Sequence, residues 1–177
     1  MLPIIITGGP GAGKTTLIDA LSANSYQTFA ESSRQLIEEQ SQLTNGVLPW
    51  LDLPGFARLC LTAMTEQKQQ ASQHEVAFLD RAIPDIFGYL QQAGLEIELC
   101  YQAESKGYHR QAFFCCPERS IYVQDEVRPY PFEGALAIHN ALVDVYQQLG
   151  FEVVEVPFMS LEERVRFIEQ ALDILQR

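Results

Sequence analysis

The sequence predicts an α/β fold in which helices cover both faces of a five-stranded parallel sheet. Two observations lead to this prediction. Short apolar runs alternate with longer stretches of 3.6-residue periodicity, and the first apolar run passes through a glycine-rich bend into an amphipathic helix. At 177 residues the chain has the length of one domain, and we expect a single domain over residues 1–177.

Each element has a local signal in the sequence. We predict strands at 3–8, 27–31, 75–80, 112–116 and 152–157. We predict helices at about 14–22, 31–42, 53–71, 84–93, 95–106, 133–149 and 161–176. The last helix is the clearest, because Ser160 and Glu163 form a capping box ahead of an apolar face. Two turn-rich stretches, 44–55 and 117–134, interrupt the pattern, and loops of this length are often functional.

The composition narrows the class of partner. Lys and Arg number 12 against 23 Asp and Glu, which gives a formal charge of -11. Nucleic-acid surfaces and polybasic membrane patches need clustered cations, so we expect neither kind of partner. No apolar run approaches the roughly 20 residues that cross a bilayer, and the MLPIII start lacks the basic region of a signal peptide. The four cysteines have no CxxC spacing, which favours reduced thiols in a cytoplasm over a zinc site.

The glycine-rich bend carries the strongest motif. Residues 8–15, GGPGAGKT, satisfy GxxxxGK[ST] between a predicted strand and a predicted helix. Backbone N–H groups of such a loop converge on phosphate oxygens, the Lys14 ammonium approaches the β and γ phosphates, and the Thr15 hydroxyl suits Mg²⁺. We therefore predict a phosphate loop (P-loop) that binds ATP with Mg²⁺ through Gly9, Pro10, Gly11, Ala12, Gly13, Lys14, Thr15 and Thr16. The alternatives are a plain glycine turn and a dinucleotide fingerprint, and Lys14 occupies the last glycine position of the latter.

Asp80 and Arg81 end the third predicted strand and bear on how the triphosphate is used. An AAA+ motor ends this strand in Asp-Glu and adds a helical lid, and a GTPase carries NKxD; neither pattern is present. Small P-loop kinases end the strand in Asp-Arg or Glu-Arg. We expect Asp80 to orient the Mg²⁺ water or to accept the acceptor's proton, and Arg81 to bind substrate or phosphate. The alternative is a structural ion pair at the strand end.

Glu31 and Arg34 follow the second predicted strand within FAESSRQLIEE. Both are expected to face the phosphate loop, Glu31 as a base or ligand of the acceptor hydroxyl and Arg34 as a clamp on the acceptor. A first-turn acid with an i,i+3 partner is the alternative.

The 117–134 loop lies where small P-loop kinases place a mobile lid. A lid arginine would stabilise charge on the transferred phosphoryl group; Arg128 is the first candidate and Arg119 the second, with ordinary surface arginines as the alternative. Aromatic residues beside the irregular stretches either stack a ring or anchor loops: Trp50, Tyr101, Tyr108 and Tyr130. Solvated or capping roles are expected for His74, His109 and His139.

Several blocks together resemble the small bacterial ATPases grouped as an AAA domain with the nicotinamide riboside kinase domain. These blocks are ITGGPGAGKTTLIDAL, ESSRQLIEEQ, LPWLDLPGFARL, FLDRAIPDIFGYL, IYVQDEVR and LGFEVVEVPFMSLEERVRFI. The resemblance implies a three-layer, kinase-like P-loop NTPase fold with sheet order 2-3-1-4-5. It also implies acceptor-side or metal roles for Glu31, Arg34, Asp80, Arg81 and Asp85, and nucleotide contacts from Asp125 and Arg128.

The combined hypothesis is an Mg²⁺-dependent phosphotransferase that moves the γ-phosphoryl group of ATP to a hydroxyl of a small acceptor, nucleoside-like compounds included. Lys14 and Arg128 would neutralise the transferred group, while Thr15 and Asp80 would serve the metal. An NTPase that uses water and a nucleotide-gated interaction module are the alternatives. The choice of Asp80 or Glu31 as base, the preference for ATP or GTP, and the oligomeric state stay open.

Overall fold

The structure, a computed structural model, describes residues 1–124 and 131–174. Its strands are β1 (Ile4–Thr7), β2 (Gln27–Phe29), β3 (Ala77–Asp80), β4 (Gln111–Cys115) and β5 (Glu152–Val156). They form one parallel sheet of order β2-β3-β1-β4-β5, in which Ile6 pairs with Asp80 and with Phe113. The predicted sheet and its order are confirmed.

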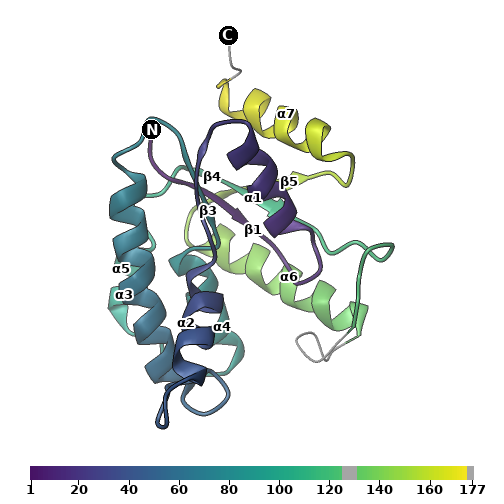
Figure 1. Cartoon of the computed structure of the whole chain (residues 1–177). Helices are drawn as coiled ribbons and strands as arrows, with labels where there is room; N and C mark the ends of the chain where they lie inside the picture. The colour runs from purple at the N-terminus through teal and green to yellow at the C-terminus, as the bar shows by residue number, and fades with distance from the viewer. Residues whose placement is uncertain (125–130, 175–177) are drawn as a thin grey trace.

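The helices are α1 (Lys14–Ala23), α2 (Ser32–Ser41), α3 (Leu53–Ala71), α4 (Ile83–Gln92), α5 (Leu99–Glu104), α6 (Phe132–Gln148) and α7 (Leu161–Leu172). Helices α1 and α7 lie together on one side of the sheet, and α3, α4 and α6 pack on the other (Figure 1). No helix within the described residues has both the length and the apolar character that a membrane crossing requires.

Strand residues alternate between two apolar cores. Ile4 and Ile6 pack with α1 and α7, whereas Ile5 packs with α3, α4 and α6. All three are completely buried, as expected for a central parallel strand that helices cover on both faces. This alternation fixes which side chains of the strand ends point toward each layer.

Helix α5 is shorter than predicted, covering residues 99–104 rather than 95–106. Gly94, with φ 66°, ends the preceding helix in a left-handed conformation. The segment that follows, residues 95–98, has no regular secondary structure, and its Ile97 packs against the core before the new helix begins. The apolar residues of this segment therefore fit a helical spacing without forming a helix. Helix α7 is also shorter than predicted, because Asp173 at φ 54° ends it after Leu172.

Candidate functional site

The phosphate loop joins the buried end of β1 to the start of α1. Gly8 has φ 131°, and a Cβ atom there would lie 2.1 Å from the carbonyl oxygen of Cys115, so only glycine fits this approach. Gly13, with φ 73°, is the N-cap of α1 and supplies no side chain to cap the helix. The first N–H groups of α1 are thus left for an anion at the positive end of the helix dipole.

Lys14 is the first residue of α1, and its side chain turns back toward the phosphate loop. Its side chain is only 8% exposed, and Nζ donates a hydrogen bond to the carbonyl oxygen of Gly9 at 3.2 Å. Burial, reinforced by the nearby Arg81 charge, lowers the pKa of Lys14 to about 8. The ammonium is therefore a cation with little solvation and a weak partner, a state that an incoming polyphosphate would stabilise.

A cavity of about 610 Å³ opens beside this loop, and we call it the phosphate cavity. It brings together most of the predicted nucleotide-binding residues with Glu31, Arg34 and Arg81. Its lining is Pro10, Gly11, Ala12, Gly13, Lys14, Thr15, Thr16, Glu31, Arg34, Ile37, Glu38, Arg81 and Tyr89. The ends of β2 and β3 and the start of α1 thus meet at one site, as ligand sites of parallel sheets do.

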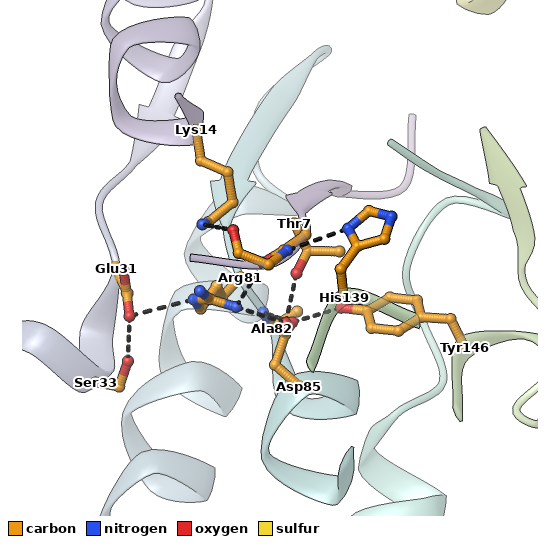
Figure 2. A network of polar contacts seen from close by, with 11 residues as sticks. Thr7, Lys14, Glu31, Ser33, Arg81, Ala82, Asp85, His139 and Tyr146 are labelled. Atoms are coloured by element: carbon orange, nitrogen blue, oxygen red, sulfur yellow. Dashed lines mark hydrogen bonds and ion pairs between the residues drawn. The ribbon is translucent and has the colours of Figure 1, made fainter. Parts of the chain in front are cut away.

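Glu31 and Arg81 form an ion pair at the edge of the phosphate cavity. Nε of Arg81 lies 3.3 Å from Oε1 of Glu31, and Ser33 Oγ donates to the same carboxylate oxygen at 2.7 Å (Figure 2). Burial raises the pKa of Glu31, but the charges of Arg81, Lys14 and Arg34 and the Ser33 hydrogen bond outweigh it, so the pKa is lowered. Glu31 is therefore a fixed carboxylate that can accept a hydrogen bond from a substrate hydroxyl.

Arg81 is held by three groups around its guanidinium. Nη1 donates to the carbonyl oxygen of Gly8 at 3.3 Å and to Oδ1 of Asp85 at 3.2 Å, while Nε faces Glu31. Burial disfavours the charged form of Arg81, yet its acidic surroundings raise its pKa well above the ordinary value. Arg81 also has φ 64°, an uncommon conformation for a residue with a side chain, and its N–H bonds to Ile6.

Asp85 requires a correction. Its carboxylate has no exposed surface and accepts hydrogen bonds from Thr7 Oγ1, the backbone N–H of Ala82 and Tyr146 Oη, in addition to Arg81 (Figure 2). With both oxygens used inside the core, Asp85 cannot take the substrate or metal contact that the resemblance implied. It anchors Arg81 instead.

Asp80 ends β3 and is buried, with 3% of its surface exposed. Burial raises the pKa of Asp80 to about 6, although the Lys14 charge opposes this shift. Its Oδ1 atom has no hydrogen-bond partner among the described residues. An unpaired, buried carboxylate oxygen is the kind of hard oxygen ligand that Mg²⁺ takes, directly or through water, and the Thr15 hydroxyl, which is exposed in the phosphate cavity, is another.

The predicted arginines have different positions. Arg34 is exposed and lines the phosphate cavity. Arg119 does not line it; its Nη2 lies 2.7 Å from Oε1 of Glu133, and its guanidinium covers the Phe132 ring. Asp125 and Arg128 lie outside the described residues. The structure thus brings Arg34 to the cavity and leaves Arg119 in a surface ion pair.

His139 is a contributor that the sequence reasoning missed. We expected a solvated or capping histidine, but His139 is 1% exposed and its Nδ1 accepts the N–H of Gly9 at 3.2 Å. Burial lowers the pKa of His139, which keeps the imidazole neutral and able to accept. Its spacing from Ala135, Leu142 and Tyr146 on one helix face was the available signal.

Arg164 is a second missed residue. It is 4% exposed, and its Nη2 donates to the carbonyl oxygen of Ala12 at 3.4 Å and to Sγ of Cys115 at 3.0 Å. A buried cation therefore lies directly under the phosphate loop, contributed by α7. The signal was a basic residue on the apolar face of that helix, beside Val165 and Ile168.

Of the four aromatic residues, Tyr101 and Tyr108 are buried anchors, 2% and 5% exposed. Trp50 is 66% exposed, and Tyr130 lies outside the described residues. Tyr89, which the sequence reasoning did not single out, lines the phosphate cavity. It also lines a second, smaller cavity between α2, α3 and α4.

Comparison with known families identifies the chain. The sequence profile of the AAA domain family matches residues 3–164. The chain belongs to the AAA domain family. No curated protein matches this AAA domain.

Solved structures share the fold of this AAA domain at low sequence identity. A deoxyadenosine kinase from M. mycoides with bound products has 17% identity and a TM-score of 0.65 over 97% of this chain and 98% of its own. Thymidylate kinase from Ehrlichia chaffeensis has 18% identity and a TM-score of 0.56 over 97% and 98%. NadR protein in complex with NR has 14% identity and a TM-score of 0.67, and the match covers 96% of this chain but 51% of NadR. The AAA domain therefore has a kinase-like P-loop fold.

Proposed function

We propose that this protein is an Mg²⁺-dependent kinase that transfers the γ-phosphoryl group of ATP to a hydroxyl of a small acceptor. The observation that carries the proposal is the Glu31–Arg81 pair in the phosphate cavity, which Lys14 also lines. A hydrolase needs only the triphosphate site and a water. A fixed carboxylate in the same cavity suits a hydroxyl brought in by a second substrate.

We assign nucleotide binding to the phosphate loop and to the charged residues around it. The phosphates would lie against the backbone N–H groups between Gly9 and Thr16, with Lys14 at the β and γ positions. Thr15 and Asp80 would hold Mg²⁺, which lowers the charge on the phosphates when bound. Arg164 adds a buried positive charge below the loop.

We assign phosphoryl transfer to the residues that would face the acceptor. Glu31 would accept the hydrogen bond of the attacking hydroxyl and receive its proton as the O–P bond forms, while ADP leaves. Arg34, exposed at the same cavity, would hold the acceptor or the transferred group. Arg128 is a further candidate for neutralising that group. Because the transition state is loose, alignment and charge account for most of the rate.

Separate measurements of ADP and inorganic phosphate test the proposal. With Mg-ATP and a library of small alcohols, a kinase forms more ADP than phosphate when its acceptor is present, and it turns over slowly without one. Equal amounts of the two products under every condition would identify an NTPase that uses water.

Glu31→Gln gives a matched test of the acceptor side. This variant should lose at least tenfold of the acceptor-stimulated rate and still bind ATP, because Glu31 approaches the hydroxyl and not the phosphate loop. Glu66→Gln on the exposed face of α3 is the control with the same change in charge. Unchanged acceptor-stimulated turnover in Glu31→Gln would remove Glu31 from the mechanism.

A further inference from the structure

Arg164 is a buried cation at the start of α7, the helix that lies beside α1 on one side of the sheet (Figure 1). A guanidinium keeps its charge throughout the pH range in which proteins stay folded. Nε of Arg164 has no hydrogen-bond partner among the described residues. The core around α7 therefore contains a charge that its surroundings satisfy only in part.

The acidic side chains next to Arg164 on α7 are occupied elsewhere. Glu162 pairs with Arg166 on the exposed face of the helix, and Glu163 accepts hydrogen bonds from Ser160 in the capping box. No carboxylate of the described residues lies within ion-pair distance of Arg164. Because a buried charge without a counter-charge lowers stability, a role in binding an anion explains this arginine better than a role in packing.

The contact with Cys115 does not neutralise Arg164. Nη2 of Arg164 lies 3.0 Å from Sγ of Cys115, the last residue of β4. Burial raises the pKa of Cys115, although the charges of Arg164 and Lys14 oppose this shift, so the sulfur stays a neutral thiol. A neutral thiol is a weak acceptor and brings no negative charge.

The second contact of Arg164 fixes one peptide plane of the phosphate loop. The same Nη2 donates to the carbonyl oxygen of Ala12 at 3.4 Å, and Nη1 lies 3.3 Å from the place that a Cβ atom would take at Gly13. The Ala12–Gly13 peptide bond is trans, so its C=O and N–H bonds point in opposite directions. Because Arg164 holds the Ala12 carbonyl toward α7, the N–H of Gly13 points away from α7.

The two ends of this peptide are used differently from those of the Gly8–Gly9 peptide. In the Gly8–Gly9 peptide the carbonyl accepts from Arg81 and the N–H donates to His139, so the protein uses both ends. The N–H of Gly13 has no acceptor among the described residues, and Gly13 lines the phosphate cavity. The loop thus leaves this N–H for a ligand.

We propose that Arg164 is a positioning residue for the phosphates of a bound nucleotide: it turns the Gly13 N–H toward the phosphate cavity, and the phosphate charge balances its own. Arg164 does not line that cavity, so it acts through the loop. The inference rests on the nucleotide-binding part of the proposed function and is independent of the acceptor. It adds to the phosphate loop a side chain that lies 152 residues farther along the chain than Ala12.

The sequence allows the Gly13 amide to be observed directly by NMR. Ala-Gly occurs twice, at 12–13 and 93–94, so labelling alanine carbonyls with ¹³C and glycine nitrogens with ¹⁵N selects two amide signals. Ala93→Ser, at an exposed position, removes the second signal and thereby assigns both. When Mg²⁺ and inorganic tripolyphosphate are added to the full chain, the Gly13 proton should move downfield, as expected for a hydrogen bond to a charged oxygen, and the Gly94 proton should not. A Gly13 signal that stays in place at saturating tripolyphosphate would overturn the proposal.

Arg164→Met removes the charge and keeps an unbranched side chain beside Val165 and Ile168. Calorimetric titration should give Kd values for tripolyphosphate and for ATP that are both about tenfold higher, because both ligands present phosphates to the same loop. Arg166→Met, which removes the same charge from the exposed face of α7, should bind both ligands normally.

Arg164→Lys tests whether the cation itself is needed. Its ammonium keeps the charge and one donor for the Ala12 carbonyl, so its Kd values should be about threefold above those of the unaltered protein. Affinity in Arg164→Met equal to that of the unaltered protein, or no better affinity in Arg164→Lys than in Arg164→Met, would overturn the proposal.

A role of Arg164 in packing alone gives a different result. In that case Arg164→Met would melt at a lower temperature and, once folded, would bind tripolyphosphate normally and show the full Gly13 shift. We expect instead a melting temperature without ligand close to that of Arg166→Met, because losing an unpaired buried charge offsets the lost contacts, and a Gly13 shift less than half as large. The Gly13 measurement on the unaltered protein needs no substitution at Arg164, so it tests the proposal even if Arg164→Met does not fold.

The outcomes distinguish this inference from the kinase function. Normal ATP and tripolyphosphate binding in Arg164→Met would overturn the positioning role and leave the kinase function standing. Failure of the unaltered protein to bind ATP would instead defeat the proposed function together with this inference.

Discussion

Nε of Arg81 lies 3.3 Å from Oε1 of Glu31, so the cation that follows β3 fixes the carboxylate that follows β2. Arg81 adopts φ 64° to do this, a conformation that costs a residue with a side chain on the order of 1 kcal/mol. Asp85 and the carbonyl oxygen of Gly8 hold the guanidinium from the opposite side. The buried network thus connects core packing to the edge of the phosphate cavity.

Asp85→Asn should disrupt this network. The change leaves Arg81 without one of its charge partners and places an amide among several hydrogen-bond donors. Breaking a buried pair in this way lowers the free energy of unfolding by about 3–5 kcal/mol. Tyr146→Phe removes one hydrogen bond to the same carboxylate and should cost about 1–3 kcal/mol. Urea unfolding measures both, and an Asp85→Asn midpoint equal to that of the unaltered protein would show that the network contributes nothing.

The pH dependence of kcat/KM should be bell-shaped. Below about 6 the raised pKa of Asp80 leaves its carboxyl protonated, so it no longer serves the metal. Above about 8 the lowered pKa of Lys14 leaves its amine neutral, so it no longer attracts the triphosphate. Initial rates at subsaturating ATP between pH 5 and 9.5 check both limbs. A flat profile across that range would contradict the two assignments.

Asp80→Asn should raise the melting temperature at pH 7 and lower the turnover. The folded protein raises the pKa of Asp80 from 3.8 to about 6, so the ionised carboxylate costs stability as pH rises through this interval. A neutral amide avoids that cost, which is about 3 kcal/mol at pH 7. Asp80→Asn should therefore melt a few degrees higher at pH 7 and equally at pH 4, while its turnover falls at least a hundredfold. A lower melting temperature at pH 7 would contradict the account.

His139→Phe should weaken ATP binding indirectly, because His139 holds the Gly9 N–H of the phosphate loop. The substitution keeps a ring against Phe114 but removes the acceptor for the Gly9 N–H, and an unpaired buried donor costs about 1–3 kcal/mol. We expect a Kd for ATP that is about tenfold higher. His139→Asn should restore part of the affinity, since its amide oxygen can accept the same N–H. The exposed His74→Phe serves as the control, and equal ATP affinity in all variants would remove His139 from the site.

The sequence predicted elements whose signals are local. GGPGAGKT specifies a tight bend with its helix, and the alternation of apolar runs specifies parallel strands, so the five strands and seven helices were predicted near their observed places, with α5 and α7 shorter than expected. The strand order came from the family resemblance and is confirmed. The ends of the strands placed Glu31, Arg81 and Lys14 near one another for the same reason, because parallel strands end at a common edge.

Contacts between distant segments were not available from the sequence. Arg164 lies 152 residues beyond the Ala12 carbonyl that it contacts, and His139 lies 130 residues beyond Gly9. The family resemblance implied an acceptor-side or metal role for Asp85, but α4 turns its carboxylate toward Tyr146 in the core. The place of Tyr89 and the smaller cavity between α2, α3 and α4 arise from the packing of three helices, which periodicity alone does not describe.

The central claim is that the phosphate cavity binds a triphosphate through Lys14, and calorimetric titration with Mg²⁺ and a non-hydrolysable ATP analogue tests it most directly. The unaltered protein should bind one analogue per chain. Lys14→Ala should bind about a hundredfold more weakly, because it loses a charge-assisted contact worth up to about 3 kcal/mol, yet it should melt normally without ligand. Lys106→Ala, the same change at an exposed lysine, should bind normally. No binding by the unaltered protein, or equal affinity in Lys14→Ala, would contradict the account.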